Sequence, residues 1–134
     1  MAFIEWSEQF SVDIASIDEQ HRHLVELINK LHGAMMAKES HLVLDEIINE
    51  LIAYTFVHFN TEEEFFSQFG YPEAENHMTE HRQFIEKVDS FHRDFVAKKI
   101  GVSVGILDFL TDWLKSHILN RDKAYGPFLR ANMA

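Results

Sequence analysis

Residues 58–84, HFNTEEEFFSQFGYPEAENHMTEHRQF, contain a helix end, a turn and the start of a second helix. His58 and Glu62 stand four residues apart before the breaker sequence Gly-Tyr-Pro, and His77 and His81 stand four residues apart after it. Side chains four residues apart on a helix project from one face, with Cβ atoms about 5–6 Å apart. The stretch therefore predicts two consecutive helices, each presenting a pair of side chains able to bind a metal.

The same helical spacing continues on both sides, because apolar residues recur at steps of three and four along most of the chain. No segment shows the period-two alternation that marks a strand. Ser40 and Ser103 are suitable N-cap residues, whereas Gly70, the pair Lys98-Lys99 and Gly101 suit helix ends. We therefore expect helices at about residues 17–38, 41–69, 72–99 and 103–122.

Short connections between long amphipathic helices force neighbouring helices to run antiparallel. The sequence thus predicts an all-α fold, an antiparallel up-down-up-down four-helix bundle, with residues 1–134 forming one domain. Residues 1–16 should form a non-helical N-terminal arm, with Trp6 and Phe10 packing on the outside of the bundle. A short segment should follow the fourth helix to residue 134.

The composition argues against several classes of protein. A formal net charge of -10, with only 12 Lys and Arg residues, disfavours binding to nucleic acid or to anionic membranes. No apolar run approaches the roughly 20 residues that span a bilayer, and the acidic N-terminal region does not resemble a signal peptide. We therefore expect a cytoplasmic protein without membrane insertion. Cysteine is absent, so any metal must be held by nitrogen and oxygen ligands.

Polar side chains interrupt the apolar stripe of every predicted helix. His21 lies on the stripe of the first helix, and His117 and Asp122 lie in the fourth. A separation of five residues turns by about 140° around an ideal α-helix, which places His117 and Asp122 on different faces. Either a π-bulge lies between them or the helix begins to unwind there. The sequence leaves both alternatives open.

Burying these seven polar groups without partners would cost on the order of 1–3 kcal/mol for each group. A bound cation would remove this cost, because it neutralises carboxylates and takes up imidazole lone pairs. Five histidines and two carboxylates exceed the about four to six positions around one ion, which favours two metal ions bridged by Glu62 and Asp122. Iron, manganese and zinc all accept such donors, and the residues alone do not select among them.

Four segments resemble the motifs of the bacterial hemerythrin family. They are IDEQHRHLVELIN at residues 17–29, HFNTEEEFFSQFGYP at 58–72, HMTEHRQF at 77–84 and WLKSHILNRDKAY at 113–125. The resemblance covers nearly the whole chain, and every ligand position of the family has the expected residue. The chain departs from the family pattern at Asp13, where relatives usually have Gly, and at Phe66, where Met is common.

The resemblance implies a non-haem centre of two iron ions per chain, bridged by an oxo or hydroxo group, Glu62 and Asp122. One iron would be held by His77, His81 and His117, and the other by His21 and His58. The second iron, with one ligand fewer, would bind dioxygen reversibly. The implied role is that of an oxygen carrier, store or delivery protein rather than an enzyme. We expect a monomer that meets an oxygen-consuming enzyme transiently.

Apolar neighbours of the ligands would keep water away from bound oxygen. The positions that line the oxygen pocket in hemerythrins are occupied here by Leu24, Phe59, Trp113, Ile118 and Leu119. Plain core packing explains each of them equally well. The sequence contains no Glu-x-x-His, the pair that marks carboxylate-rich di-iron proteins. A di-iron enzyme acting on peroxide or nitric oxide, or an oxygen-sensing module, are the alternative functions.

The remaining histidines do not fit the spacing of the motifs. We interpret them as surface or hydrogen-bonding residues; they are His23, His32, His41 and His92. Within the acidic run Glu62-Glu63-Glu64 we expect one ligand and two solvated side chains.

Overall fold

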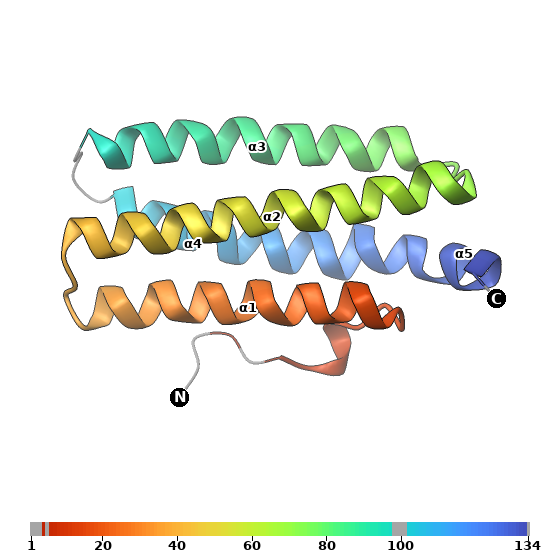
Figure 1. The fold of residues 1–134 in the computed structure, drawn as a ribbon, viewed down its shortest axis with the longest axis horizontal. Helices are drawn as coiled ribbons and strands as arrows, with labels where there is room; N and C mark the ends of the chain where they lie inside the picture. Colours follow the sequence, from red (N-terminus) through yellow and green to blue (C-terminus); the bar gives the residue numbers. More distant parts are fainter. Residues whose placement is uncertain (1–3, 5, 98–101, 134) are drawn as a thin grey trace.

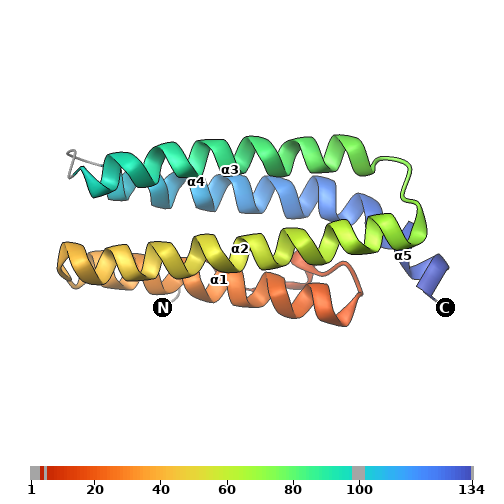
Figure 2. The same cartoon turned by 45° about the horizontal axis from the view of Figure 1, so that its top comes forward.

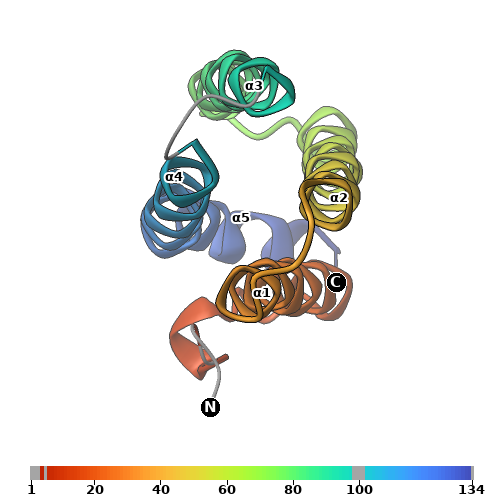
Figure 3. The same cartoon turned by 90° about the vertical axis from the view of Figure 1, so that its left-hand side faces the viewer.

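The computed structural model describes residues 4, 6–97 and 102–133 of the chain. Its main elements are four long helices, α1 (Ala15–Met36), α2 (His41–Phe69), α3 (Ala74–Val96) and α4 (Val102–Ser116). These helices run antiparallel along one another (Figures 1 and 2) and occupy the four corners of a square when viewed along the bundle (Figure 3). The prediction of an up-down-up-down four-helix bundle is confirmed.

Three shorter elements complete the fold: a 3-10 turn η1 (Glu8–Phe10), a π-helix η2 (His117–Asp122) and a last helix α5 (Lys123–Met133). The π-helix continues directly from α4 and leads directly into α5. The chain therefore stays helical beyond residue 122, where the sequence predicted the end of the fourth helix. Figure 1 shows α5 at the end of the bundle where α2 turns into α3.

Helix ends follow the local chemistry of the chain. Ser40 is the N-cap of α2, and its hydroxyl accepts a hydrogen bond from the backbone N–H of Val43 at 3.2 Å. Gly70 ends α2 with a left-handed φ of 67°, a conformation that favours glycine. The helix α3 begins at Ala74 rather than at residue 72, because Ala74 N–H closes a turn onto the Tyr71 carbonyl at 3.2 Å.

Two expected helix signals fall outside the described residues. They are the segment at Lys98-Lys99 and Gly101, expected to end the third helix, and the side chain of Ser103, expected to cap the fourth.

The N-terminal arm packs against the bundle more closely than expected. Phe10 is buried in the main core, so the prediction that it packs on the outside is wrong. The turn η1 directs its ring inward beside the half-buried ring of Trp6, with 5.7 Å between the ring centroids. The arm is then fixed to α1, because the carboxylate of Asp18 accepts hydrogen bonds from Ser11 Oγ at 2.6 Å and from the backbone N–H of Val12 at 2.7 Å.

The interior contains two apolar clusters. The larger one fills most of the bundle, and the smaller, here called the end cluster, joins the arm, α1, α2 and α5. The end cluster consists of Val12, Ile14, Ile17, Phe66, Tyr125 and Leu129. In the part of the chain that the structure describes, no helix combines the length and apolar character needed to cross a bilayer.

Candidate metal centre

The bundle brings all seven predicted ligands together between the two apolar clusters. α1 contributes His21, α2 contributes His58 and Glu62, α3 contributes His77 and His81, and η2 contributes His117 and Asp122. All seven side chains are buried. Residues widely separated in the sequence thus form one polar site inside an otherwise apolar core.

The π-helix resolves the spacing of the last two predicted ligands. In a π-helix the hydrogen bonds join residues five apart, so side chains five residues apart become neighbours. His117 Nε2 consequently lies 3.0 Å from Asp122 Oδ1, and both side chains face the core. Of the two alternatives left open by the sequence, the π-bulge is the one found.

The nitrogen and oxygen atoms of the site fall into two groups, each compact enough to surround one ion. The three-histidine group contains His77, His81 and His117, and the two-histidine group contains His21 and His58. Within each group, the possible ligand atoms lie within 4.8 Å of one another. Glu62 belongs to both groups, and Asp122 is grouped with the two-histidine group.

Asp122 lies between the two groups and directs one carboxylate oxygen to each. Its Oδ1 atom lies 3.1 Å from His77 Nε2, and its Oδ2 atom lies 2.8 Å from His21 Nε2. Glu62 Oε1 lies 3.1 Å from His81 Nε2 and 3.3 Å from His58 Nε2. Both carboxylates therefore contact histidines of both groups, which is the arrangement expected of bridging ligands.

Hydrogen bonds on the outer side of the site fix the protonation of four imidazole rings. His21 Nδ1 contacts the Phe10 carbonyl at 3.2 Å, and His58 Nδ1 contacts Gln20 Oε1 at 2.8 Å. His81 Nδ1 contacts Glu63 Oε2 at 2.9 Å. His117 Nδ1 contacts Glu80 Oε1 at 3.4 Å. Because these oxygens only accept hydrogen bonds, each Nδ1 must carry a proton, which leaves Nε2 as the metal-binding nitrogen.

The inner side of the site consequently has more acceptors than donors. The Nε2 atoms of His58, His81 and His117 are buried without a hydrogen-bond partner among the described residues, and so are both oxygens of Glu62. Each Nε2 lone pair faces a carboxylate oxygen, so two acceptors meet unless a cation or a proton lies between them. The donor set therefore fits buried divalent metal ions, which bind neutral imidazole and carboxylate together.

The ionisation behaviour of the metal-free site has the same cause. Burial opposes charge on Glu62, and the Asp122 carboxylate adds to this, but His58, His77 and His81 outweigh both and lower the pKa of Glu62 to about 2. Burial opposes protonation of His77, but hydrogen bonds to Asp122 and Glu62 raise its pKa to about 9. In the metal-free protein, the two buried carboxylates thus favour the protonated form of His77.

Four of the five predicted pocket residues are buried or half-buried, and two of them stack on candidate ligands. Leu24, Phe59 and Ile118 are buried, and the half-buried ring of Trp113 stacks on the His117 ring with centroids 4.2 Å apart. Phe59 stacks on His81 with centroids 3.8 Å apart. Leu24 and Trp113 also help to line a small apolar cavity with room for about one water-sized molecule.

Leu119 is the most exposed of the five predicted pocket residues. Its side chain is 37% exposed, whereas Ile118 beside it is fully buried. Neighbouring positions on a helix point in different directions, and η2 directs His117, Ile118 and Asp122 inward. The role of Leu119 in lining an oxygen pocket stays a prediction, and its partial exposure distinguishes it from the buried Ile118.

Sequence reasoning missed the residues that orient the histidines. Glu63 was expected to be solvated, yet it is only 32% exposed and contacts His81. Gln20, Glu80 and the Phe10 carbonyl were not predicted to have any role. Gln20 precedes His21 in the sequence, but it contacts His58 on another helix. Glu80 likewise precedes His81, but it contacts His117. Adjacency in the sequence therefore does not reveal either contact.

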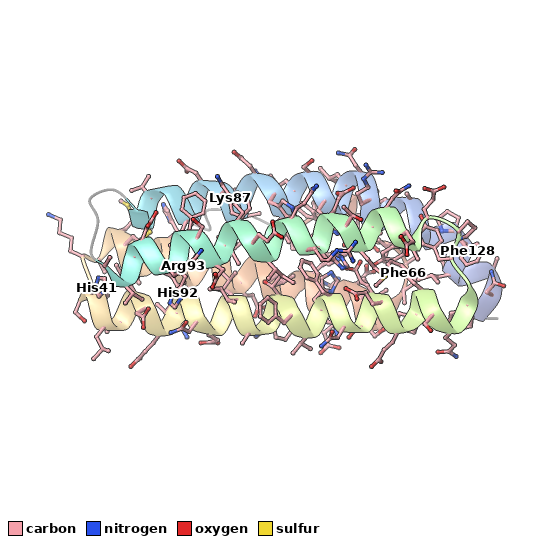
Figure 4. All side chains as sticks on the ribbon, turned by 90° about the horizontal axis from the view of Figure 1, so that it is seen from above. His41, Phe66, Lys87, His92, Arg93 and Phe128 are labelled. Carbon is pink, nitrogen blue, oxygen red and sulfur yellow. The ribbon has the colours of Figure 1, made fainter. Side chains whose placement is uncertain are left out.

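Three of the histidines outside the motifs contact residues other than the candidate ligands. His92 Nε2 contacts Asp45 Oδ1 at 3.0 Å, as expected of a hydrogen-bonding residue. His41 stacks on Phe95 with centroids 4.2 Å apart, and His23 lies against Tyr54. Figure 4 places His41 and His92 towards one end of the bundle and Phe66, which contacts His77, towards the other.

Comparison with known proteins agrees with this geometry. A family model described as the hemerythrin HHE cation binding domain matches residues 12–129. A bacteriohemerythrin of Pseudomonas aeruginosa is 37% identical over 100% of this chain and 86% of its own length. A bacteriohemerythrin of Methylococcus capsulatus is 30% identical over 98% of this chain and 100% of its own length.

The fold is also similar to solved structures. A crystal structure described as wild-type hemerythrin superposes with a TM-score of 0.88 at 29% sequence identity, covering 96% of this chain and 98% of that one. The match of the family model extends over most of the chain and includes all seven candidate ligands. The chain belongs to the hemerythrin family.

Proposed function

We propose that this protein binds dioxygen reversibly at a centre of two iron ions and serves as an oxygen carrier or store rather than an enzyme. The observation that supports it most strongly is the buried set of acceptor atoms facing one another in two compact groups. Membership of the hemerythrin family supports iron and oxygen as the metal and the ligand.

In this proposal His77, His81 and His117 would hold one iron, His21 and His58 would hold the other, and Glu62 and Asp122 would be shared between them. The unequal number of ligands would leave room for oxygen on the two-histidine side. When bound, the two ferrous ions would supply the electrons and the free position that a dioxygen ligand requires.

The residues of the chain favour reversible binding in two ways. Five of the seven donors are neutral imidazoles, which support high-valent iron less strongly than carboxylates do. Leu24, Phe59 and Ile118 are buried apolar residues, and Phe59 stacks on His81, so in this proposal they would keep out water that could otherwise supply protons. Exclusion of water and weak support for high-valent iron would both slow oxidation of the centre. Release of bound dioxygen could then compete with that oxidation.

The test is anaerobic loading with ferrous iron, followed by repeated cycles of air and argon while visible absorption is recorded. We expect two irons per chain and an absorption band that appears in air and disappears under argon over several cycles. Irreversible conversion to the ferric state, or many turnovers with hydrogen peroxide, would count against a carrier and favour an enzyme.

Two variants control the iron count. His58→Ala should lower it because a proposed ligand is lost, whereas His23→Ala should leave it at two. His23 is a suitable match, because it lies two positions from His21 but points to Tyr54 and not to the site.

A further inference from the structure

The two groups of histidines differ in the charge of the residues that orient them. In the two-histidine group, the outer nitrogens donate to neutral oxygens, the Phe10 carbonyl and the Gln20 amide. In the three-histidine group, His81 and His117 donate to carboxylates, those of Glu63 and Glu80. The residues that accept hydrogen bonds from the Nδ1 atoms are therefore neutral on one side of the site and negatively charged on the other.

The contact of Glu63 with His81 is the stronger of the two carboxylate contacts. Glu63 Oε2 lies 2.9 Å from His81 Nδ1, whereas Glu80 Oε1 lies 3.4 Å from His117 Nδ1. Glu80 also forms an ion pair with Arg121, which offsets its negative charge. Glu63 is thus the residue best placed to increase electron donation by a ligand ring.

Gln20 is the neutral counterpart of Glu63, and its orientation is fixed. The hydroxyl of Thr61 donates to the Val57 carbonyl at 3.1 Å, so its oxygen accepts a hydrogen bond from Gln20 Nε2 at 3.0 Å. The amide oxygen of Gln20 is therefore the atom that faces His58 Nδ1. Glu63 and Gln20 perform the same contact on opposite groups, one with a charge and one without.

We propose that Glu63 is a positioning residue that makes the three-histidine group the tighter of two unequal metal sites, and that Gln20 keeps the two-histidine group the weaker one. This inference rests on the proposed function only in requiring that the centre hold two ions. A carboxylate that accepts the Nδ1–H of a ligand raises the basicity of the ring, and changes to such partners cost about 10–100-fold in metal affinity. A neutral amide gives a weaker effect, since charged hydrogen bonds are roughly twice as strong as neutral ones.

The test is a calorimetric titration of the metal-free protein with zinc, which accepts the same donors without redox chemistry. The wild-type protein should bind two zinc ions in a tight step and a weaker step. His58→Ala assigns the steps, because it should remove the weaker one and retain the tight one. Circular dichroism before titration checks that each variant is folded.

Isosteric exchanges then isolate the charge. Glu63→Gln should weaken the tight step about tenfold and leave the weaker step unchanged. Gln20→Glu should strengthen the weaker step by a similar factor, a gain that a merely structural role cannot produce. Glu80→Gln should have a smaller effect on the tight step than Glu63→Gln. The matched control is Glu64→Gln, which removes the same charge at the exposed neighbouring position.

The outcomes separate this inference from the proposed function. If the protein binds two zinc ions per chain but Glu63→Gln and Gln20→Glu change neither affinity, the proposed role of Glu63 and Gln20 is wrong. The two-ion centre itself would still be supported. An equal effect of Glu64→Gln would also overturn the proposed role, because net charge would then be the cause. Fewer than two zinc ions in the wild-type protein would instead contradict the two-ion centre itself.

Discussion

The two halves of the bundle interior are held together by different forces. In the apolar half, around Leu31, Ile48 and Val88, buried aliphatic side chains fill the space between the helices. In the polar half, around Glu62 and Asp122, buried acceptors face one another and need a cation or protons between them. The apolar half is therefore complete in the polypeptide alone, and we expect a bound metal to add stability only to the polar half. Four predictions test this difference.

Removal of the metal should have the largest effect. If free metal exceeds its dissociation constant about a thousandfold, chelation should lower the free energy of unfolding by about 4 kcal/mol. Urea unfolding followed by circular dichroism, with and without chelator, measures the change. Asp122→Asn should reduce the chelator effect strongly, because it weakens a ligand shared by both groups. A chelator effect below about 1 kcal/mol in the wild-type protein would show that the polar half is complete without metal.

Leu31→Ala should destabilise the apolar half by about 2–5 kcal/mol, since it leaves a cavity at a fully buried position. The same loss is expected in the metal-loaded and metal-free protein, because distant sites act additively within about 0.5 kcal/mol. The free energy of unfolding is measured for the variant and the wild-type protein, each with and without metal. A clear difference between the two losses would mean that the halves are energetically coupled.

The stability of the metal-free protein should depend on pH, because the pKa values of two residues in the polar half are shifted in opposite directions. The pKa of His77 is raised from 6.5 to about 9, so its stabilising contribution is complete below pH 6.5 and is lost as pH rises through 9. The pKa of Glu62 is lowered from 4.5 to about 2, so its contribution is complete above pH 4.5 and is lost as pH falls towards 2. Metal-free protein should therefore be most stable between about pH 4.5 and 6.5 and lose on the order of 2 kcal/mol by pH 9.

Urea unfolding of the metal-free protein across this pH range provides the measurement. Metal-loaded protein should behave in the opposite way between pH 6.5 and 9, because metal ions compete with protons for imidazole. His77→Gln should remove part of the alkaline loss in the metal-free state. Equal pH profiles with and without metal would contradict proton occupancy of the site.

Asp13→Gly should have the smallest effect, a stabilisation of about 1 kcal/mol or less that does not depend on metal. Asp13 has a φ of 58°, a left-handed conformation that strains most residues and suits glycine. This conformation would also explain why the family pattern that the sequence resembles has a glycine at this position. Thermal unfolding measures the shift, and Ser16→Gly, inside α1, should instead be destabilising. Destabilisation by Asp13→Gly would indicate that its contact with Ser11 outweighs the strain.

The sequence predicted the fold and the residues that the bundle brings together at the candidate site, because both depend on spacing along single helices. Steps of three and four defined the bundle, and the pairs His58 with Glu62 and His77 with His81 followed from the same rule. Glu63 and Gln20 could not be assigned in this way, because their contacts with His81 and His58 cross between helices. Phe10 was misplaced for a related reason, since burial of an arm depends on how it packs and not on its own periodicity.

The π-helix has a consequence for the molecule beyond the alignment of His117 with Asp122. It amounts to a one-residue insertion in a continuous helix, so every residue of α5 is rotated by about 100° from where an unbroken α-helix would place it. With that rotation Tyr125 and Leu129 join Val12 and Phe66 in the end cluster. A single added residue thus brings His117 and Asp122 together and, a turn later, places Tyr125 and Leu129 in the apolar cluster that closes this end of the bundle.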